Sequence, residues 1–378
     1  MNKLWISIGI LLFLIGLALV VPCLKAGETK AVGHLQVLAP IRNGNLTIFP
    51  VVADTSHDTS QFLTLDEGLR SGDVVVTEAG SAAPLVRPRP DHPTWDEHRP
   101  DQPTWDEHRR TSGAQVNQLV LINNSKRPLL LLAGEIVTGG KQDRIIGKDR
   151  LVPAESDPVD LSVFCVEPGR WVGSTAKFGA PMAMVQPSVR AKAMADKDQQ
   201  KVWNQVGQAR AAMAETVTVE ASADAAAPIQ ESSSYARAVD NQEVKKQLDT
   251  VAAPVQQQYQ SVIHQLRDKH AVGVVVAVNG QLIWADVFAS TGLLEKYWPK
   301  LVRSYAAETF SQQGKSAAVD MHAAQEFLDH LDGRREIVEK EPGLYQHAEI
   351  TGDGYKVFAL TSLLPSTGFD LHVAKMEE

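Results

Sequence analysis

The strongest constraint on the fold is a stretch near the middle of the chain, residues 128–171, where a buried-strand signal stands beside polar and charged residues. Leu129–Leu132 are four consecutive leucines, and a short apolar run without alternation is typical of a strand buried on both faces. Pro128 suits the start of such a strand, where its missing N–H costs least. The expected partner is Val116–Ile122, because the residues between the two, NNSKR, are good turn formers. We expect the protein to be organised around this stretch and to carry any site there.

A glycine pair, Gly139-Gly140, follows the leucine run and is flanked by charged side chains. Glycine permits positive φ and close backbone approach, so these N–H groups are suited to an anion-binding concavity beside cationic side chains. A polar β-turn between two strands is the simpler interpretation of the same glycines. A phosphate-binding P-loop is excluded, because Glu135 stands where that motif needs its first glycine and Gln142 follows the lysine. The residues that we predict to bind a ligand are Glu135, Gly139, Gly140, Lys141, Gln142, Arg144, Glu167 and Arg170.

The pair Asp-Arg occurs at residues 143–144 and again at 149–150. On one continuous strand this spacing puts both aspartates on one face and both arginines on the other. A turn at Gly147-Lys148 would instead place the two pairs across from each other in a hairpin. Either arrangement is compatible with a ladder of salt bridges or with an arginine-lined pocket for a carboxylate or phosphate group.

Residues 161–171, LSVFCVEPGRW, alternate in hydropathy and predict a further strand that ends in a turn at Pro168-Gly169. Cys165 lies in this apolar strand without a histidine near it in the sequence, which predicts a buried, unreactive thiol. The only other cysteine is Cys23, so no disulfide framework is expected.

Several of these motifs together resemble one known family. They are LLLLAGEIVTGGKQDR, LVPA and LSVFCVEPGRW, and the later segment WADVFASTGLLEKYWPKLVRSYAAE is similar to that family's C-terminal half. The family is the ARG and rhodanese-phosphatase-superfamily-associated protein domain, and the resemblance covers most of the chain after about residue 30. No activity is established for the family, so the resemblance implies no catalytic residues. The family's name implies a connection with nucleotide or ADP-ribose metabolism through the domains that accompany it.

Residues 4–21 form an uncharged, strongly apolar run behind a short basic start, as in a secretory signal or an N-terminal membrane anchor. The run is long for a cleaved signal, and the possible cleavage sites after it are poor, so an uncleaved signal-anchor is favoured. We expect residues 1–26 to contact the membrane and the rest to be exported, either membrane-anchored or periplasmic. The net charge of −8 argues against nucleic acid as a partner.

The remaining signals divide the chain into regions and predict the α+β class. Residues 31–172 predict a β-rich domain, sandwich or jelly-roll-like, that begins with a hairpin around Asn43-Gly44 and shares its strands with the central stretch. Residues 173–240 predict a helix and then a mobile linker rich in Ala, Ser and Glu. Residues 241–378 predict a helix-covered antiparallel sheet, with a second hairpin at Asn279-Gly280.

A proline-rich tandem repeat interrupts the first region. RPDHPTWDEH at residues 89–98 recurs as RPDQPTWDEH at residues 99–108. The prolines predict an extended, exposed loop. Its histidines and aspartates are of metal-binding types, but an extended loop lacks a fixed geometry, so we interpret it as a repeat expansion and predict no metal site.

Two functions of different classes fit the sequence. The first is a non-catalytic envelope module that binds an anionic ligand or a protein partner through residues 134–171. The second is a hydrolase for a nucleotide or ADP-ribose-like substrate, in which Lys141, Arg144 and Arg170 hold negative charge and Glu135 or Glu167 does acid–base work. The sequence contains no HExxH, GxSxG or CxxC motif, which favours the first, and it identifies no cofactor.

Overall fold

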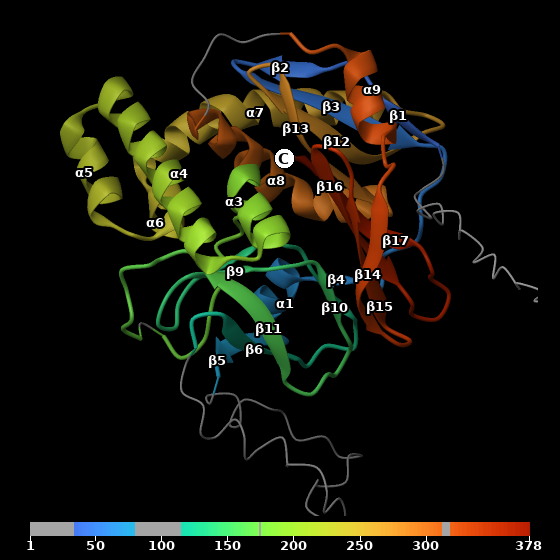
Figure 1. The fold of residues 1–378 in the computed structure, drawn as a ribbon, viewed down its shortest axis with the longest axis horizontal. Helices are drawn as coiled ribbons and strands as arrows, with labels where there is room; N and C mark the ends of the chain where they lie inside the picture. Colours follow the sequence, from blue (N-terminus) through green and yellow to red (C-terminus); the bar gives the residue numbers. More distant parts are fainter. Residues whose placement is uncertain (1–33, 80–114, 174, 312–317) are drawn as a thin grey trace, which may run out of the picture.

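The structure is a computed structural model that describes residues 34–79, 115–173, 175–311 and 318–378. Its largest element is a nine-stranded antiparallel sheet (Figure 1). The strands follow the order β1 (Leu35–Val37), β3 (Leu46–Ala53), β12 (His270–Val278), β13 (Gln281–Phe288), β17 (Asp370–Glu377), β16 (Tyr355–Ser362), β15 (Tyr345–Thr351) and β14 (Arg334–Glu341), and β2 (Ile41–Asn43) also pairs with β3. With its helices, this sheet confirms the predicted α+β class.

Helices cover both faces of the large sheet near β12. Along this strand Val274 and Val276 face one way and Val275 faces the other, because side chains alternate across a strand. The first two pack in one core cluster with α7 (Gln242–Gln265) and α8 (Thr291–Ser311). Val275 packs in another core cluster with α9 (Met321–Asp329). The uninterrupted apolar sequence of β12 follows from this double burial.

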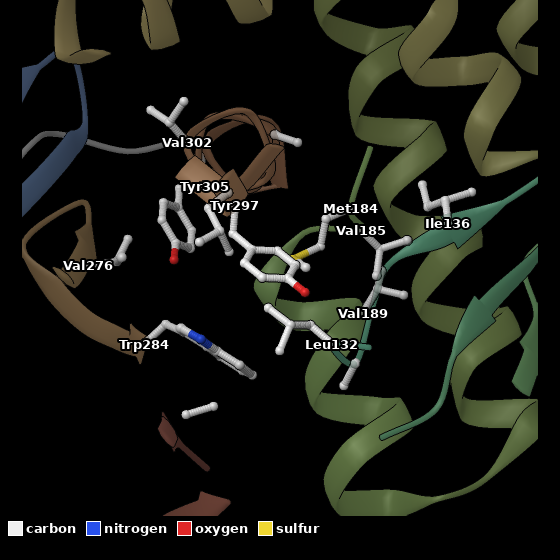
Figure 2. Close-up of a cluster of buried hydrophobic side chains, with 14 of the residues drawn as sticks. Leu132, Ile136, Met184, Val185, Val189, Val276, Trp284, Tyr297, Val302 and Tyr305 are labelled. Carbon is white, nitrogen blue, oxygen red and sulfur yellow. The ribbon is translucent and has the colours of Figure 1, made fainter. Parts of the chain in front are cut away.

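The central stretch shares its core with the large sheet. Figure 2 shows Trp284 from β13 and Tyr305 from α8 in the same buried cluster as Leu132 and Ile136. Met184, which precedes α3 (Pro187–Ala191), joins them. The two regions are therefore continuous in packing.

Two smaller sheets carry most of the central stretch and lie toward the bottom of Figure 1. One has the order β5 (Val74–Glu78), β6 (Gln118–Asn123), β11 (Val159–Cys165), β9 (Arg144–Ile146) and β8 (Ile136–Val137). The other has the order β10 (Arg150–Val152), β7 (Leu129–Leu131) and β4 (Leu63–Thr64), and α1 (Leu65–Ser71) follows β4.

The leucine run is fully buried, as predicted, but its predicted partner is wrong. Strand β7 pairs with β10 and β4, whereas β6 pairs with β5 and β11. The cause lies in the turn between them. The buried amide of Asn123 donates to the carbonyls of Arg127 and Pro153, both at 2.8 Å, and this leads the chain out of one sheet and into the other. The two Asp-Arg pairs are separated in the same way, because β9 and β10 belong to different sheets.

The hairpin at Asn43-Gly44 forms as predicted, but its assignment to the strands of the central stretch is wrong. All eight residues of β3 are buried, and the strand pairs with β12 from the C-terminal half. A strand buried on both faces needs covered neighbours at both edges, and β1 and β12 supply them. The large sheet thus takes strands from both the 31–172 and the 241–378 regions.

The segment predicted as a mobile linker is helical. After α3 come the π-helix η2 (Lys192–Asp196), α4 (Gln199–Glu220), α5 (Ala223–Glu231) and α6 (Tyr235–Asp240). Alanine favours helix, and the serines provide caps: the side chains of Ser222 and Ser234 accept N–H groups at the starts of α5 and α6. The alanine- and serine-rich composition therefore encodes short capped helices.

In the part of the chain that the structure describes, no helix is both long and apolar enough to cross a membrane. The predicted anchor at residues 1–26 and the tandem repeat at residues 89–108 lie outside the described residues.

Gly134 is a position where the fold requires glycine. Its φ is +88°, and a Cβ there would lie 2.5 Å from Cγ of Arg190, a side chain fixed by two hydrogen bonds to Asp286. We expect Gly134→Ala to lower the free energy of unfolding by about 2–4 kcal/mol, since left-handed strain and overpacking add. Urea denaturation of the full chain measures this.

Gly44→Ala is the matched control, because Gly44 also has positive φ, +60°, but has nothing within 4 Å of its missing Cβ. It should lose only the strain, about 1 kcal/mol. Equal losses at the two glycines would mean that Arg190 moves aside.

Candidate functional site

A cavity of about 480 Å³ lies between the central stretch and the helices α6, α7 and α8. Its wall combines backbone of the glycine loop with the segment 181–184 and with side chains of the three helices. The charged residues that line it are Asp143, Arg170, Arg237, Asp240, Lys245, Lys300 and Arg303. Of the eight residues predicted from the sequence, Gly139 and Arg170 line this cavity.

The glycine loop connects β8 and β9, and its N–H groups donate to acceptors of the protein itself. Gly139 and Gly140 have φ of +129° and +50°. The N–H of Gly139 donates to Asp143 at 3.1 Å, and the N–H of Lys141 donates to Glu78 at 2.8 Å. Hydrogen bonds within the protein therefore fix the shape of the loop.

Arg170 holds this loop against the end of β11. Its guanidinium donates to the carbonyls of Gly140 at 2.9 Å and Gly139 at 3.3 Å, and it pairs with Glu167 at 2.7 Å. The hydrogen bond to Glu167 raises the pKa of Arg170. The predicted ligand residues Gly139, Gly140, Glu167 and Arg170 are thus brought together, as a scaffold beside the cavity.

Gln142 and Asp143 complete the scaffold. The amide of Gln142 donates to the carbonyl of Glu167 at 3.0 Å. Asp143, which the sequence prediction omitted, accepts from Ser234 at 2.7 Å and contacts Arg170 at 3.4 Å. Burial raises the pKa of Asp143, although the Ser234 hydrogen bond opposes the shift. Asp143 is the carboxyl group of the central stretch that lines the cavity.

Arg144 and Lys141 lie on another side of the loop. The Arg144 side chain is fully buried, and its Nε donates to the carbonyl of Val116 at 2.7 Å. Burial lowers the pKa of Arg144. The two cations lie over the ring of Trp171, at 5.9 Å for Arg144 and 5.1 Å for Lys141. Neither lines the cavity.

Glu135 belongs to a buried ion-pair cluster at the base of the cavity. It pairs with Lys300, which also pairs with Asp66 at 2.5 Å, and it accepts the N–H of Leu132 at 2.6 Å. Burial raises the pKa of Glu135 against the pull of Lys300. Burial alone would lower the pKa of Lys300, but the two carboxylates raise it. Lys300 lines the cavity, and Glu135 lies behind it.

The rim of the cavity carries cations in weaker pairs. Lys245 of α7 pairs with Asp240 at 2.6 Å, and Arg303 of α8 pairs with Asp249, with side chains that are 37–76% exposed. The Arg237 side chain of α6 is exposed, and its guanidinium has no partner among the described residues. The sequence prediction missed these three because they come from helices beyond residue 230, and only the tertiary fold brings them to the glycine loop.

A second polar cluster is fully enclosed. His372 contacts Asp149 at 2.6 Å and Asp286 at 3.0 Å, and Asp286 also pairs with Arg190 at 2.9 Å. All four side chains have no exposed surface. Burial alone would lower the pKa of His372, but the two carboxylates raise it to about 9. None of these four residues lines the cavity, and the cluster ties β17, β13, α3 and the turn before β10 together.

Within the described residues, no group of three or more His, Cys, Asp or Glu side chains is arranged to hold a metal ion. The cavity is lined by cations, by the carboxyl groups of Asp143 and Asp240, and by apolar side chains. Fold and site together define an α+β protein with a cavity that several cationic side chains line.

The sequence comparison identifies the family. The model of the ARG and Rhodanese-Phosphatase-superfamily-associated Protein domain matches residues 34–374, so the chain belongs to this family. The resemblance seen in the motifs of the central stretch is thereby confirmed. No curated protein and no solved structure gives a significant match.

The buried histidine predicts a pH dependence of stability. Because the folded state raises the pKa of His372 from 6.5 to about 9, its contribution is complete below pH 6.5 and is lost as pH rises through 9. Lys375, whose pKa burial lowers to about 8, acts in the opposite direction above that pH. We therefore expect the free energy of unfolding to fall by roughly 1–2 kcal/mol between pH 6.5 and 8.

Urea denaturation at several pH values across this window measures the slope. His372→Gln should be less stable overall and should lose the slope. A wild-type profile that stays flat from pH 6.5 to 8 would show that the histidine is neutral in the folded protein.

Proposed function

We propose that this protein is a ligand-binding module that takes an anionic ligand into the cavity between the glycine loop and helices α6, α7 and α8. The observation that carries the proposal is the exposed guanidinium of Arg237 at the rim, which has no partner among the described residues. An arginine fork binds carboxylate and phosphate groups by paired hydrogen bonds.

Two neighbouring cations strengthen the proposal. The pairs of Lys245 with Asp240 and of Arg303 with Asp249 are exposed, and such surface pairs contribute only about 0–1 kcal/mol each. An arriving anion can therefore draw both cations toward itself at little cost. The buried pairs of Arg170 and Lys300 differ, because removing either cation would leave a buried carboxylate alone.

Of the eight residues predicted from the sequence, only those that line the cavity would contact the ligand. Gly139 and Arg170 form part of the wall, and Gly140, Gln142 and Glu167 hold the loop in place. A membrane-anchored or exported location, expected from residues 1–26, is part of the same proposal and rests on the sequence alone.

A hydrolase for an anionic substrate is the second candidate, and one observation favours it. Asp143 lines the cavity, and burial raises its pKa, as a general acid requires. In this role Asp143 replaces Glu135 and Glu167, which lie behind the wall. Turnover of a bound organic phosphate or nucleotide that Asp143→Asn abolishes would establish this function, and binding without turnover would exclude it for that ligand.

Arg237→Ala tests the binding function. Full-length protein is heated with phosphate, pyrophosphate, nucleotides, ADP-ribose or sugar phosphates. A ligand that binds the folded state should raise the melting temperature by mass action. We expect Arg237→Ala to abolish that rise and to leave the melting temperature without ligand unchanged, because the side chain is exposed.

The matched control is Arg267→Ala, since Arg267 is also exposed and does not line the cavity. It should keep the full ligand effect. An anion whose stabilising effect survives Arg237→Ala would place the binding site elsewhere, and a panel without any stabilising anion would refute the proposed function.

A further inference from the structure

The apolar wall of the cavity contains a strained residue. Met182 has φ of +54°, a conformation that a large side chain without a polar group rarely adopts. Its side chain is 52% exposed, so burial in the core does not compensate for the strain. Backbone strain of this kind gathers at binding sites.

Met182 is held by the residues that follow it and by a contact of its own side chain. Its neighbour Ala183 accepts the N–H of Ile136 at 3.1 Å, and Met184 is buried in the core. The guanidinium of Arg70 contacts the sulfur of Met182 at 3.1 Å. The segment from Pro181 to Met184 thus holds Met182 in place in the cavity wall.

The size of the cavity points to more than an inorganic ion. Its volume of about 480 Å³ lies in the range that holds small organic ligands, roughly 300–1,000 Å³. Besides the charged rim, the lining includes Pro181, Met182, Met184, Leu248 and Ala307. A ligand that fills this space has an apolar body as well as a charge.

We propose, building on the anion-binding function above, that the ligand is an organic phosphate whose flat apolar body packs against Met182 while its phosphate group contacts Arg237. Arg237 is unpaired among the described residues, and the pairs of Lys245 with Asp240 and of Arg303 with Asp249 are exposed, so a phosphate group with two negative charges can draw these two cations from their partners more strongly than a carboxylate with one. The sulfur of Met182 contacts Arg70, so the ring packs against the methylene groups of the side chain, whose flexibility lets it adapt to the shape of the ring.

The test compares ligands that differ only in the apolar body. Dissociation constants of the full chain for inorganic phosphate, phenyl phosphate and AMP are measured by calorimetry. We expect phenyl phosphate and AMP to bind at least about tenfold more tightly than inorganic phosphate, from the apolar area that the body buries.

Met182→Gly should weaken phenyl phosphate and AMP about tenfold and leave inorganic phosphate unchanged. Glycine adopts positive φ freely, so this variant should be at least as stable as the wild type. Met182→Asn is the second variant, because asparagine also tolerates this backbone conformation and replaces an apolar side chain by a polar one. Met321→Ala, at a methionine that is 48% exposed on α9 and lies outside the cavity, should change none of the constants.

The outcomes separate the two proposals. If inorganic phosphate binds as tightly as the two organic phosphates, and Arg237→Ala abolishes this binding, the anion-binding function stands and the inference about the apolar body is wrong. If both Met182 variants bind the organic phosphates as tightly as the wild type does, the inference about the apolar body is also wrong. If no probe binds, the proposed function and this inference both fail.

Discussion

The interior is organised around one buried charge, the carboxylate of Asp286. Arg190 donates to both of its oxygens, His372 contacts one of them at 3.0 Å, and the hydroxyl of Tyr305 donates to the other. Removing one partner of a buried pair typically costs about 3–5 kcal/mol, because the remaining charge is left without compensation. Helices α3 and α8 and strand β17 therefore stabilise one another through Asp286, which makes the packing around it cooperative.

Contacts with this cluster also fix the position of the cavity wall. Arg190 packs against Gly134, whose carbonyl accepts the N–H of Val185 at 3.0 Å. That hydrogen bond and an antiparallel β-bridge between the backbones of Glu135 and Met184 align the segment 181–184 along the central stretch. The wall is consequently rigid where it meets the core, while the cations that face it lie on exposed turns of three helices.

Local sequence patterns predicted the parts of this structure that depend on neighbours in the chain. The leucine run is buried, the turns at Asn43-Gly44 and Asn279-Gly280 form hairpins, and α8 covers the segment in which apolar residues recur at helical spacing. Pairings between distant segments were predicted wrongly, because a strand such as β3 shows in its sequence that it is buried but not which strand lies beside it. The same limit applies to the site. Gly139 and Arg170 were found beside the cavity, whereas the rim cations required the tertiary fold.

The position of the last strand has a consequence for how the protein is made. Strand β17 lies in the middle of the large sheet, between β13 and β16, although it follows all the other described strands in the chain. Strand β3, near the start of the described chain, likewise pairs with β12, which is made much later. During synthesis, the other strands of the large sheet therefore emerge before β17, and the edges of β13 and β16 stay open until β17 has been made. Loss of β17 would leave β13 and β16 without their shared partner and would divide the sheet in two.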